Sequence, residues 1–211
     1  MNPDKQQTES YFSKMKGITK SPPAVNFSEI WWSWIGAFLG ISSLSYLHFN
    51  ICLTNTDLEM LVGSFGASAV LIYGATKSPL AQPRNLIGGH IISAIIGVVC
   101  YKLLGSGITN TFVDSNNIIG AACYIVLGTP HMWIASSLAV ATAIAAMHAT
   151  KTLHPPGGAT ALIAVIGSDS IHNLGFLYAL IPVGAGALIM LIVALLVNNI
   201  PKSRRYPEFW F

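Results

Sequence analysis

The sequence predicts an all-α integral membrane protein with about six transmembrane or half-spanning helices, arranged as two inverted three-segment repeats. Three observations support this prediction. Charged residues form only 9% of the 211-residue chain, whereas a soluble domain has about 25%. The mean hydropathy is +0.59, and most Lys, Arg, Asp and Glu residues lie in the termini or in short gaps between apolar runs. Finally, residues of about 30–104 resemble residues of about 131–198, segment by segment.

The first repeat unit contains two runs that are long enough to cross a bilayer and one interrupted run between them. A full crossing needs about 20 apolar residues, because a helix rises about 1.5 Å per residue. Residues 30–49 meet this length and begin with a cluster of tryptophans, which is typical of a membrane interface. Residues 58–75 are apolar but interrupted by glycines, and residues 85–104 form the next full span.

A polar gap at about 105–117 separates the two units. Residues 118–128 follow it and are apolar, but they are too short to span a bilayer alone. Whether they cross is left open by the sequence, and a crossing there would change the parity of the topology.

The second unit repeats the order of long, short and long segments. Its three segments are predicted over 131–150, 158–167 and 173–198. In the last of them, Pro182 and Gly184 indicate a local kink rather than a break, because Pro and Gly are tolerated in membrane helices.

Matching motifs support the repeat. "GASAVLIYG" begins at Gly66 and "GATALIAVIG" begins at Gly158, and their first five positions agree in residue type. Upstream, "WIGAFLGISSLSYLH" begins at Trp34 and "WIASSLAVATAIAAMH" begins at Trp133. An odd number of crossings in each unit turns the copies upside down relative to each other, with a site at their interface near the midplane. Chance similarity between Gly- and Ala-rich membrane helices is the alternative.

The Lys and Arg residues predict where the ends of the chain lie. Residues 1–28 and 201–211 are expected to be cytoplasmic tails that flank a membrane domain at 29–200. Six crossings put 50–57 and 168–172 outside, and four crossings are the alternative if the short segments only dip into the bilayer. The N-terminal tail holds no apolar run typical of a signal peptide. We therefore expect a multi-pass protein of the cytoplasmic (inner) cell membrane with both termini cytoplasmic.

The stretch "TLHPPGGATALIAVIG", residues 152–167, places prolines and glycines ahead of a short apolar segment. Proline is tolerated at a helix start, so we expect a helix from Gly158 that covers half of the hydrocarbon core. Its free N–H groups and partial positive charge need a partner inside the bilayer, and an anion is a natural one. A matching start near Ser64 would complete an anion site. The alternative is a small-residue packing face.

Two motifs resemble those of a known family. "LHPPGGATALIA" at 153–164 and "SPLAQPRNLIGGH" at 78–90 are similar to the hallmark blocks of the HPP family of integral membrane proteins, and the resemblance covers about 30–198. It leaves out the N-terminal tail and "YPEFWF". The family is usually described with four membrane helices, against the six predicted here. Members from photosynthetic lineages look like nitrite transporters, so the resemblance implies anion transport. A C-terminal regulatory CBS pair, present in some members, is not expected.

The candidate substrate-binding residues are polar residues and glycines of the short segments and of the third span. His154 and His90 are ionisable groups in apolar surroundings, so each is either functional or a neutral histidine that is bonded within the fold. Arg84 offers a planar fork to an oxyanion, or it anchors the membrane interface. The hydroxyl groups either line a pathway or join helices. The full set is Ser64, Gly66, Ser68, Gln82, Arg84, Asn85, His90, His154, Gly157, Gly158 and Thr160.

The leading hypothesis is transport of a small inorganic anion, with nitrite first, through a central site between the repeat units. The alternative is a transporter of another small anion or of a neutral solute. An intramembrane enzyme, with His154 and His90 as acid and base and Ser64 as nucleophile, ranks lower because the spans show no acidic pair. The expected partners are the anion and the lipid bilayer.

Other partners and cofactors find little support. Cys52, Cys100 and Cys123 lie far apart and lack the spacing of metal ligands, so neither a metal site nor a cofactor is expected. The net charge of +3 comes mostly from the termini and reflects topology rather than nucleic-acid binding. The small residues at 184–187 serve either self-association into a homo-oligomer or internal packing.

Overall fold

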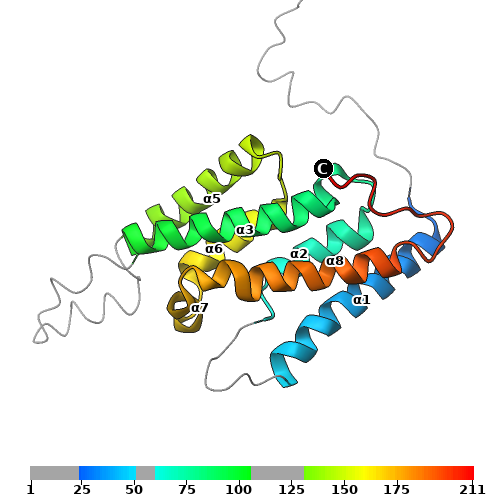
Figure 1. Cartoon of the computed structure of the whole chain (residues 1–211), viewed down its shortest axis with the longest axis horizontal. Helices are drawn as coiled ribbons and strands as arrows, with labels where there is room; N and C mark the ends of the chain where they lie inside the picture. Colours follow the sequence, from blue (N-terminus) through cyan, green and yellow to red (C-terminus); the bar gives the residue numbers. More distant parts are fainter. Residues whose placement is uncertain (1–23, 51–59, 106–130) are drawn as a thin grey trace, which may run out of the picture.

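The computed structural model describes residues 24–50, 60–105 and 131–211, and every regular element in these ranges is helical (Figure 1). The all-α prediction is therefore confirmed. The segment at 118–128 lies outside the described residues. In chain order the elements are α1 (Phe27–Asn50), α2 (Ser64–Ala69) with its π-helical continuation η2 (Val70–Gly74), η3 (Pro79–Ala81), α3 (Pro83–Cys100) with η4 (Tyr101–Gly105), α5 (Met132–Ala149), α6 (Pro155–Ile166), α7 (Asp169–Leu174), η5 (Ala179–Gly184) and α8 (Ala185–Val197).

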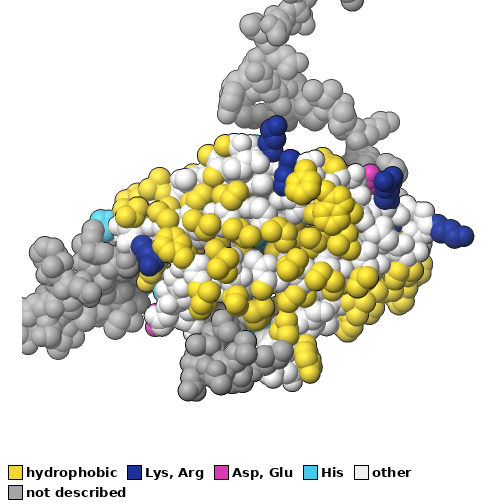
Figure 2. Space-filling view, in the orientation of Figure 1, with side chains coloured by type: hydrophobic (Ala, Val, Ile, Leu, Met, Phe, Trp, Pro, Cys, Tyr) yellow, Lys and Arg dark blue, Asp and Glu magenta, His cyan; other side chains and the backbone are white. Residues whose placement is uncertain are grey.

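The described residues include long and short apolar helices, but α1, predicted as a full span at 30–49, is not among the helices apolar enough to cross a membrane. Three helices of the described residues are long and apolar enough to cross a membrane, namely Pro83–Gly105, Met132–Ala149 and Ala179–Val197, and two shorter apolar helices are Ser64–Gly74 and Pro155–Ile166. The 12 residues of α6 cover about 18 Å of a hydrocarbon core about 30 Å thick. The face seen in Figure 2 is mostly hydrophobic, with Lys and Arg at its edges. These features identify a membrane protein.

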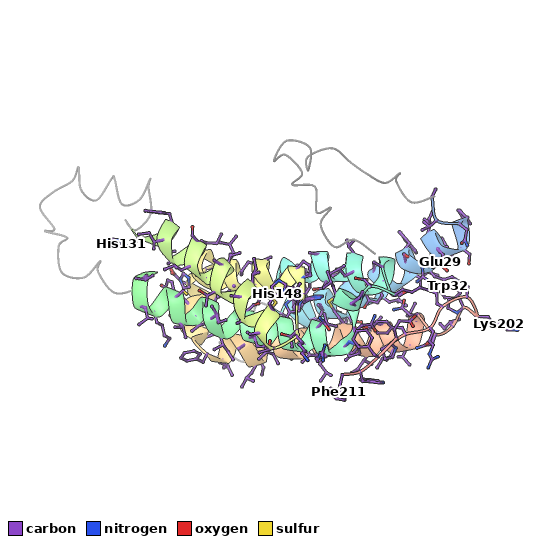
Figure 3. The ribbon with its side chains drawn as sticks, turned by 90° about the horizontal axis from the view of Figure 1, so that it is seen from above. Glu29, Trp32, His131, His148, Lys202 and Phe211 are labelled. Carbon is purple, nitrogen blue, oxygen red and sulfur yellow. The ribbon has the colours of Figure 1, made fainter. Side chains whose placement is uncertain are left out.

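The helices run between two ends of the bundle. At the terminal end, α1 begins and α8 ends, and Figure 3 places Glu29, Trp32 and Lys202 there. At the far end, α3 ends and α5 begins, directly after His131. In Figure 1, α3 and α8 cross the molecule in opposite directions, and the two short helices start near the centre and run to opposite ends. These directions are the ones that an inverted repeat requires, and the repeat itself stays a prediction.

The start of α6 differs from the expectation. The helix begins at Pro155, three residues before the predicted start at Gly158, so the two prolines form part of its first turn. Proline fits there because the first N–H groups of a helix have no partner within the helix. His154 is the N-cap residue, with φ −139° and ψ 104°, and this extended backbone is the one favoured before a proline.

The last span is shorter than the expected 173–198. The separate helix α7 ends at Leu174 and is followed by Gly175, whose φ of +52° is a conformation favoured by glycine. The spanning helix then begins at Ala179. The kink is present: Ile181 has φ −137° and ψ 117°, because the following Pro182 disfavours helical backbone at the residue before it.

Small residues bring helices into close contact. A Cβ atom added to Gly186 would lie 2.5 Å from the ring of Phe65, and Ala187 is fully buried. Part of the small-residue segment at 184–187 thus packs inside the chain, one of the two uses expected for it.

Candidate functional site

Five polar side chains meet at the centre of the bundle, where α2 and α6 contact the middle of α3. Each is at most 1% exposed, and we call this set the central cluster: Ser64, Ser68, His90, His154 and Thr160. All five are candidates from the sequence. Buried polar groups destabilise a protein unless they are hydrogen-bonded, so the contacts within the cluster decide what it can do.

Helix geometry brings these side chains together. Ser64 and Ser68 are four residues apart on α2 and share one face of that helix. His154 precedes α6, Thr160 lies in the second turn of α6, and His90 lies within α3. Ser68 and Thr160 occupy matched positions in the two predicted repeat units, and both contact the His90 ring.

Ser68 bridges the two histidines. Its Oγ lies 2.7 Å from Nε2 of His90 and 2.9 Å from Nε2 of His154. On the other side of the His90 ring, Nδ1 lies 2.7 Å from Oγ1 of Thr160, and this oxygen lies 2.9 Å from Oγ of Ser64. The two ring centroids are 5.0 Å apart. The cluster therefore forms one continuous chain of contacts from Ser64 to His154.

One contact fixes the direction of the hydrogen bonds. Nδ1 of His154 lies 2.8 Å from the carbonyl oxygen of Leu80, which can only accept, so this nitrogen carries a hydrogen. If the His154 ring is neutral, its Nε2 has no hydrogen and accepts a hydrogen bond from the Ser68 hydroxyl. The Ser68 oxygen accepts from Nε2–H of His90, and Nδ1 of a neutral His90 ring accepts from Thr160, whose hydroxyl can alternatively donate to Ser64 or to the Pro156 carbonyl. With both rings neutral, the hydrogen bonds point from Thr160 toward Leu80.

The described neighbours of the cluster are aromatic and hydroxyl groups. The Phe65 ring lies 5.2 Å from the His90 ring between centroids, and the Tyr178 hydroxyl donates to the Thr160 carbonyl at 3.4 Å. Among the described residues, no carboxylate is hydrogen-bonded to a cluster side chain, and no group of three or more His, Cys, Asp or Glu could hold a metal ion. The cluster thus offers hydroxyl and imidazole hydrogens without a negative partner.

Three candidates at the start of α3 lie outside the cluster. Nε2 of Gln82 donates to the carbonyls of Thr76 and Ser78 at 2.9 and 2.8 Å, and its Oε1 accepts from the backbone N–H of Glu208 at 2.8 Å. Gln82 therefore joins a loop to the C-terminal segment. Nδ2 of Asn85 donates to the carbonyl of Leu153 at 2.8 Å, next to His154. Buried Oδ1 of Asn85 and Nε of Arg84 have no hydrogen-bond partner.

The side of each glycine that a Cβ would occupy points away from the cluster, and the expectation that the glycines open the helix starts to an anion stays a prediction. Gly66 is exposed, and no atom lies within 4 Å of an added Cβ there. An added Cβ at Gly158 would point to Val140 of α5, at 3.8 Å, and Gly157 packs against α3. Residues that are two positions apart in a helix point in directions about 200° apart. Gly66 therefore faces away from Ser64 and Ser68.

Some backbone N–H groups at the helix starts also have partners. The N–H groups of Phe65 and Gly66 donate to the carbonyls of Val62 and Gly63 at 2.9 and 3.2 Å, and that of Gly157 donates to the carbonyl of His154 at 2.8 Å. Side-chain donors are therefore better placed to meet an anion than these backbone groups. Sequence reasoning also missed Leu80 and Tyr178, because nothing in their local sequence marks a contact made across the fold.

Comparisons with known proteins agree with the fold. Residues 22–207 match the family model described as "HPP, transmembrane region", beyond both limits of the resemblance noted at 30–198. Two proteins of Dictyostelium discoideum, both described as transmembrane proteins, are 45% and 42% identical over 95% of this chain. The chain spans only 57% and 63% of their lengths. No solved structure matches.

Proposed function

Because the chain belongs to the HPP family of integral membrane proteins, we propose that it transports a small inorganic anion, with nitrite as the first substrate, through the central cluster. The single observation that carries this proposal is the set of buried hydrogen-bonding side chains where the two short helices meet α3. An ionisable group inside a membrane domain is a functional candidate by default. Here two such groups lie in contact with one serine.

The chemistry of the cluster favours an anion over a cation. Imidazole and hydroxyl groups donate hydrogen bonds, whereas cation sites usually show embedded carboxylates or unwound carbonyl groups. The cluster of the described residues contains no carboxylate. An anion that enters would replace one of the contacts of Ser68 or Thr160 and receive hydrogen bonds from the hydroxyl group and imidazole N–H that it separates.

The proposed architecture is an inverted repeat with the site between its units. In this proposal, α1 to α3 and α5 to α8 rock against each other about the cluster and expose it alternately to each side. The opposite directions of α2 and α6 in Figure 1 support it. Arg84 and Asn85 lie at the terminal end of α3 and would guide the anion toward His154.

Uptake into proteoliposomes tests the function. The purified full chain is reconstituted, and uptake of nitrite, nitrate, chloride, formate and the neutral solute urea is compared with that of protein-free vesicles. We expect saturable uptake of nitrite or another small anion. Uptake of urea alone would support the neutral-solute alternative, and the absence of any anion uptake by folded protein would contradict the proposal.

Replacing Thr160 with valine should lower anion uptake several-fold. Valine has nearly the same shape but no hydroxyl, so Nδ1 of His90 loses its partner, at a cost of about 1 kcal/mol for one hydrogen bond. Initial uptake rates over a range of anion concentrations measure the effect. Thr160→Ser keeps the hydroxyl and is the matched control. Equal rates for Thr160→Val and the unmodified protein would show that the hydroxyl does not contact the anion pathway.

The termini are proposed to lie on the cytoplasmic side. In a variant without the native cysteines, single cysteines replace Lys202 at the terminal end or Asp169 near the far end, and both positions are exposed. A membrane-impermeant thiol reagent should label Asp169→Cys from outside intact cells and Lys202→Cys only after the cells are opened. Labelling of both from the same side would refute this topology.

A second candidate function, an intramembrane hydrolase, is favoured by one contact. Ser68 lies within hydrogen-bond distance of two imidazoles, as a nucleophile lies next to its base. A fluorophosphonate probe with mass spectrometry decides between the two: modification of Ser68 would favour the enzyme. We expect no modification, because the Ser68 hydroxyl is fully buried and bonded to both rings.

A further inference from the structure

We propose that the central cluster carries one proton with each anion, by means of a relay in which the Ser68 hydroxyl passes the proton between His90 and His154. The inference rests on the proposed function and adds a coupling ion to it. It follows from the geometry of three contacts: 2.7 Å from His90 to Ser68, 2.9 Å from Ser68 to His154 and 2.8 Å from His154 to the Leu80 carbonyl.

The cluster has a place for one added proton. When Nδ1 of His90 gains a proton, the Thr160 hydroxyl must turn away, because both groups would otherwise donate. Two acceptors are in reach of this hydroxyl: Oγ of Ser64 at 2.9 Å and the Pro156 carbonyl at 3.2 Å. The Nδ1–H group then donates to the Thr160 oxygen. Every hydrogen of the chain therefore keeps a partner in the charged state as well as in the neutral state.

The proton then moves through Ser68 in one balanced step. His90 gives its Nε2 hydrogen to the Ser68 oxygen, and Ser68 gives its own hydrogen to Nε2 of His154. Two N–H or O–H bonds break and two form, and the positive charge passes from His90 to His154. His154 keeps the Nδ1 hydrogen that it donates to Leu80, so its ring needs no rotation.

The two ends of the relay face the two ends of the bundle. Leu80 is half-buried and belongs to η3, beside the start of α3 at the terminal end. Thr160 lies further along α6, which runs toward the far end. An anion that enters from either side thus meets a histidine able to hold the proton. A departing anion takes one N–H proton from the charged His154 ring, so both rings are neutral again, and a return of the His90 hydrogen from Nδ1 to Nε2 completes the cycle.

The proton and the anion stabilise each other at this site. The ionisable groups that the structure places in or against the cluster are the two histidines and Tyr178, and no carboxylate is bonded to it among the described residues. A charge in such a buried place is unfavourable unless it is paired. An imidazolium and a monovalent anion together are neutral, so each favours the entry of the other, and the transported pair carries no net charge.

Uptake driven by a pH gradient tests the inference. Proteoliposomes of the full chain contain a pH-sensitive dye at pH 7.5, and nitrite is added outside at pH 7.5 or pH 6.5, with protein-free vesicles as the control for diffusion of nitrous acid. Protein-dependent uptake should rise up to about tenfold at the lower pH, as one bound proton requires. The lumen should acidify by one proton per anion, and an imposed membrane potential should leave the rate unchanged.

Two serine variants separate the relay from the fold. Ser68→Ala should slow proton-coupled uptake by about a hundredfold, the lower end of what positioned proton transfer contributes, and Ser68→Thr should restore it. Ser93→Ala is the matched control, because Ser93 of α3 is fully buried, as Ser68 of α2 is, but its hydroxyl contacts Met147. If Ser68→Ala fails to fold, His154→Gln provides the same test, since an amide can hydrogen-bond but does not carry the proton.

The outcomes distinguish this inference from the proposed function. Nitrite uptake that ignores the pH gradient, responds to membrane potential and survives in Ser68→Ala would overturn proton coupling and leave anion transport standing. Absence of protein-dependent anion uptake under every condition would overturn both. Coupled uptake that is lost in Ser68→Ala and kept in Ser93→Ala would support both.

Discussion

Replacing Arg204 with alanine should destabilise the protein by about 3 kcal/mol and cause much of it to be lost during extraction from the membrane. The Arg204 side chain is only 2% exposed and pairs with Glu29 of α1, with 2.7 Å between Nε and Oε2. Breaking a buried ion pair typically costs about 3–5 kcal/mol. We expect the lower end of this range, because the Glu29 side chain is 29% exposed and keeps contact with solvent or headgroups.

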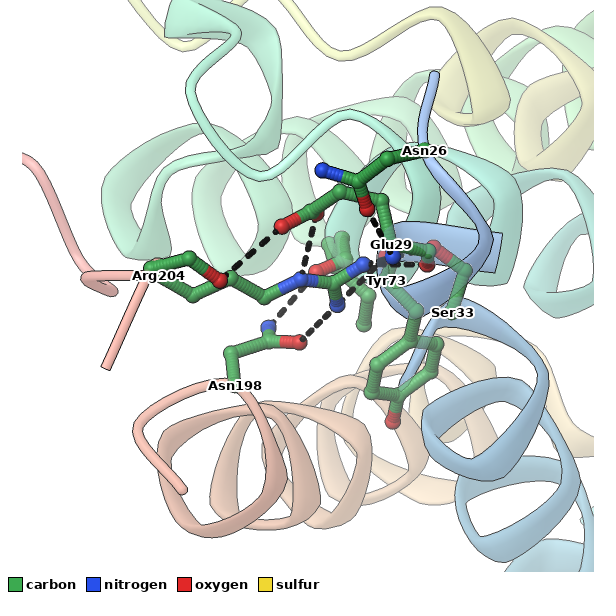
Figure 4. A network of polar contacts seen from close by, with 8 residues as sticks. Asn26, Glu29, Ser33, Tyr73, Asn198 and Arg204 are labelled. Atoms are coloured by element: carbon green, nitrogen blue, oxygen red, sulfur yellow. Dashed lines mark hydrogen bonds and ion pairs between the residues drawn. The ribbon is translucent and has the colours of Figure 1, made fainter. Parts of the chain in front are cut away.

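The guanidinium of Arg204 joins elements that are far apart in the sequence (Figure 4). One terminal nitrogen, Nη2, donates to the Glu29 carbonyl at 2.6 Å and to Ser33 at 2.9 Å. The other, Nη1, donates to the Tyr73 carbonyl at 3.2 Å and to Asn198 at 3.4 Å. Arg204 thus caps the end of α2–η2, the helix whose start holds two serines of the central cluster, and ties that end to α1 and α8.

Arg205 provides a matched control for this prediction. It is exposed, whereas Arg204 is buried, so Arg205→Ala removes the same charge without breaking a buried network. Thermal unfolding in detergent, followed by size-exclusion chromatography, should show a lower midpoint for Arg204→Ala only. Arg204→Lys should fall between them, because one ammonium group cannot replace the five donors of the planar fork. Equal midpoints for all three variants would mean that the network contributes little to stability.

The bounds of the long helices were predictable from the sequence, because each helix corresponds to a long run of apolar residues that ends at polar residues. Residues 30–49, 85–104 and 131–150 correspond to α1, α3–η4 and α5 within a few residues. The boundary at Gly175 was missed, because an apolar count treats a sharp turn between two apolar stretches as continuous helix. Similarly, the sequence predicts too late a start for α6, because two prolines are as typical of a preceding loop as of a first helical turn.

The members of the central cluster were also predictable, but their connections were not. His90, His154, Ser68 and Thr160 stand out as polar residues in apolar segments, where burial is the default. Which hydroxyl contacts which ring depends on how three helices pack, and a single sequence carries no record of that packing. The Arg204 network shows the same limit more strongly, since its partner Glu29 is 175 residues away and both residues read as ordinary charges near the termini.

The adjacent glycines of the "HPPGG" motif should respond in opposite ways to substitution. Gly157→Val should destabilise the protein by about 3 kcal/mol and abolish uptake, because an added Cβ would lie 2.9 Å from the Gly89 carbonyl oxygen, 2.7 Å from Oγ of Ser93 and 2.9 Å from Sδ of Met147. A backbone carbonyl cannot move aside cheaply, and overpacking typically costs about 1–3 kcal/mol.

Gly158→Val should leave the protein folded and active within about twofold, because the nearest atom to an added Cβ is a methyl carbon of Val140 at 3.8 Å, an ordinary contact. The same thermal unfolding assay and nitrite uptake compare the pair, which differ by one position in the chain and by about 100° around the helix. Under the proposed transport function, the comparison also decides along which face of α6 an anion would reach the centre. If Gly158→Val folds normally but blocks uptake, the anion passes along the face of α6 toward α5. If Gly158→Val transports normally, the pathway runs on the opposite face, where Thr160 contacts His90.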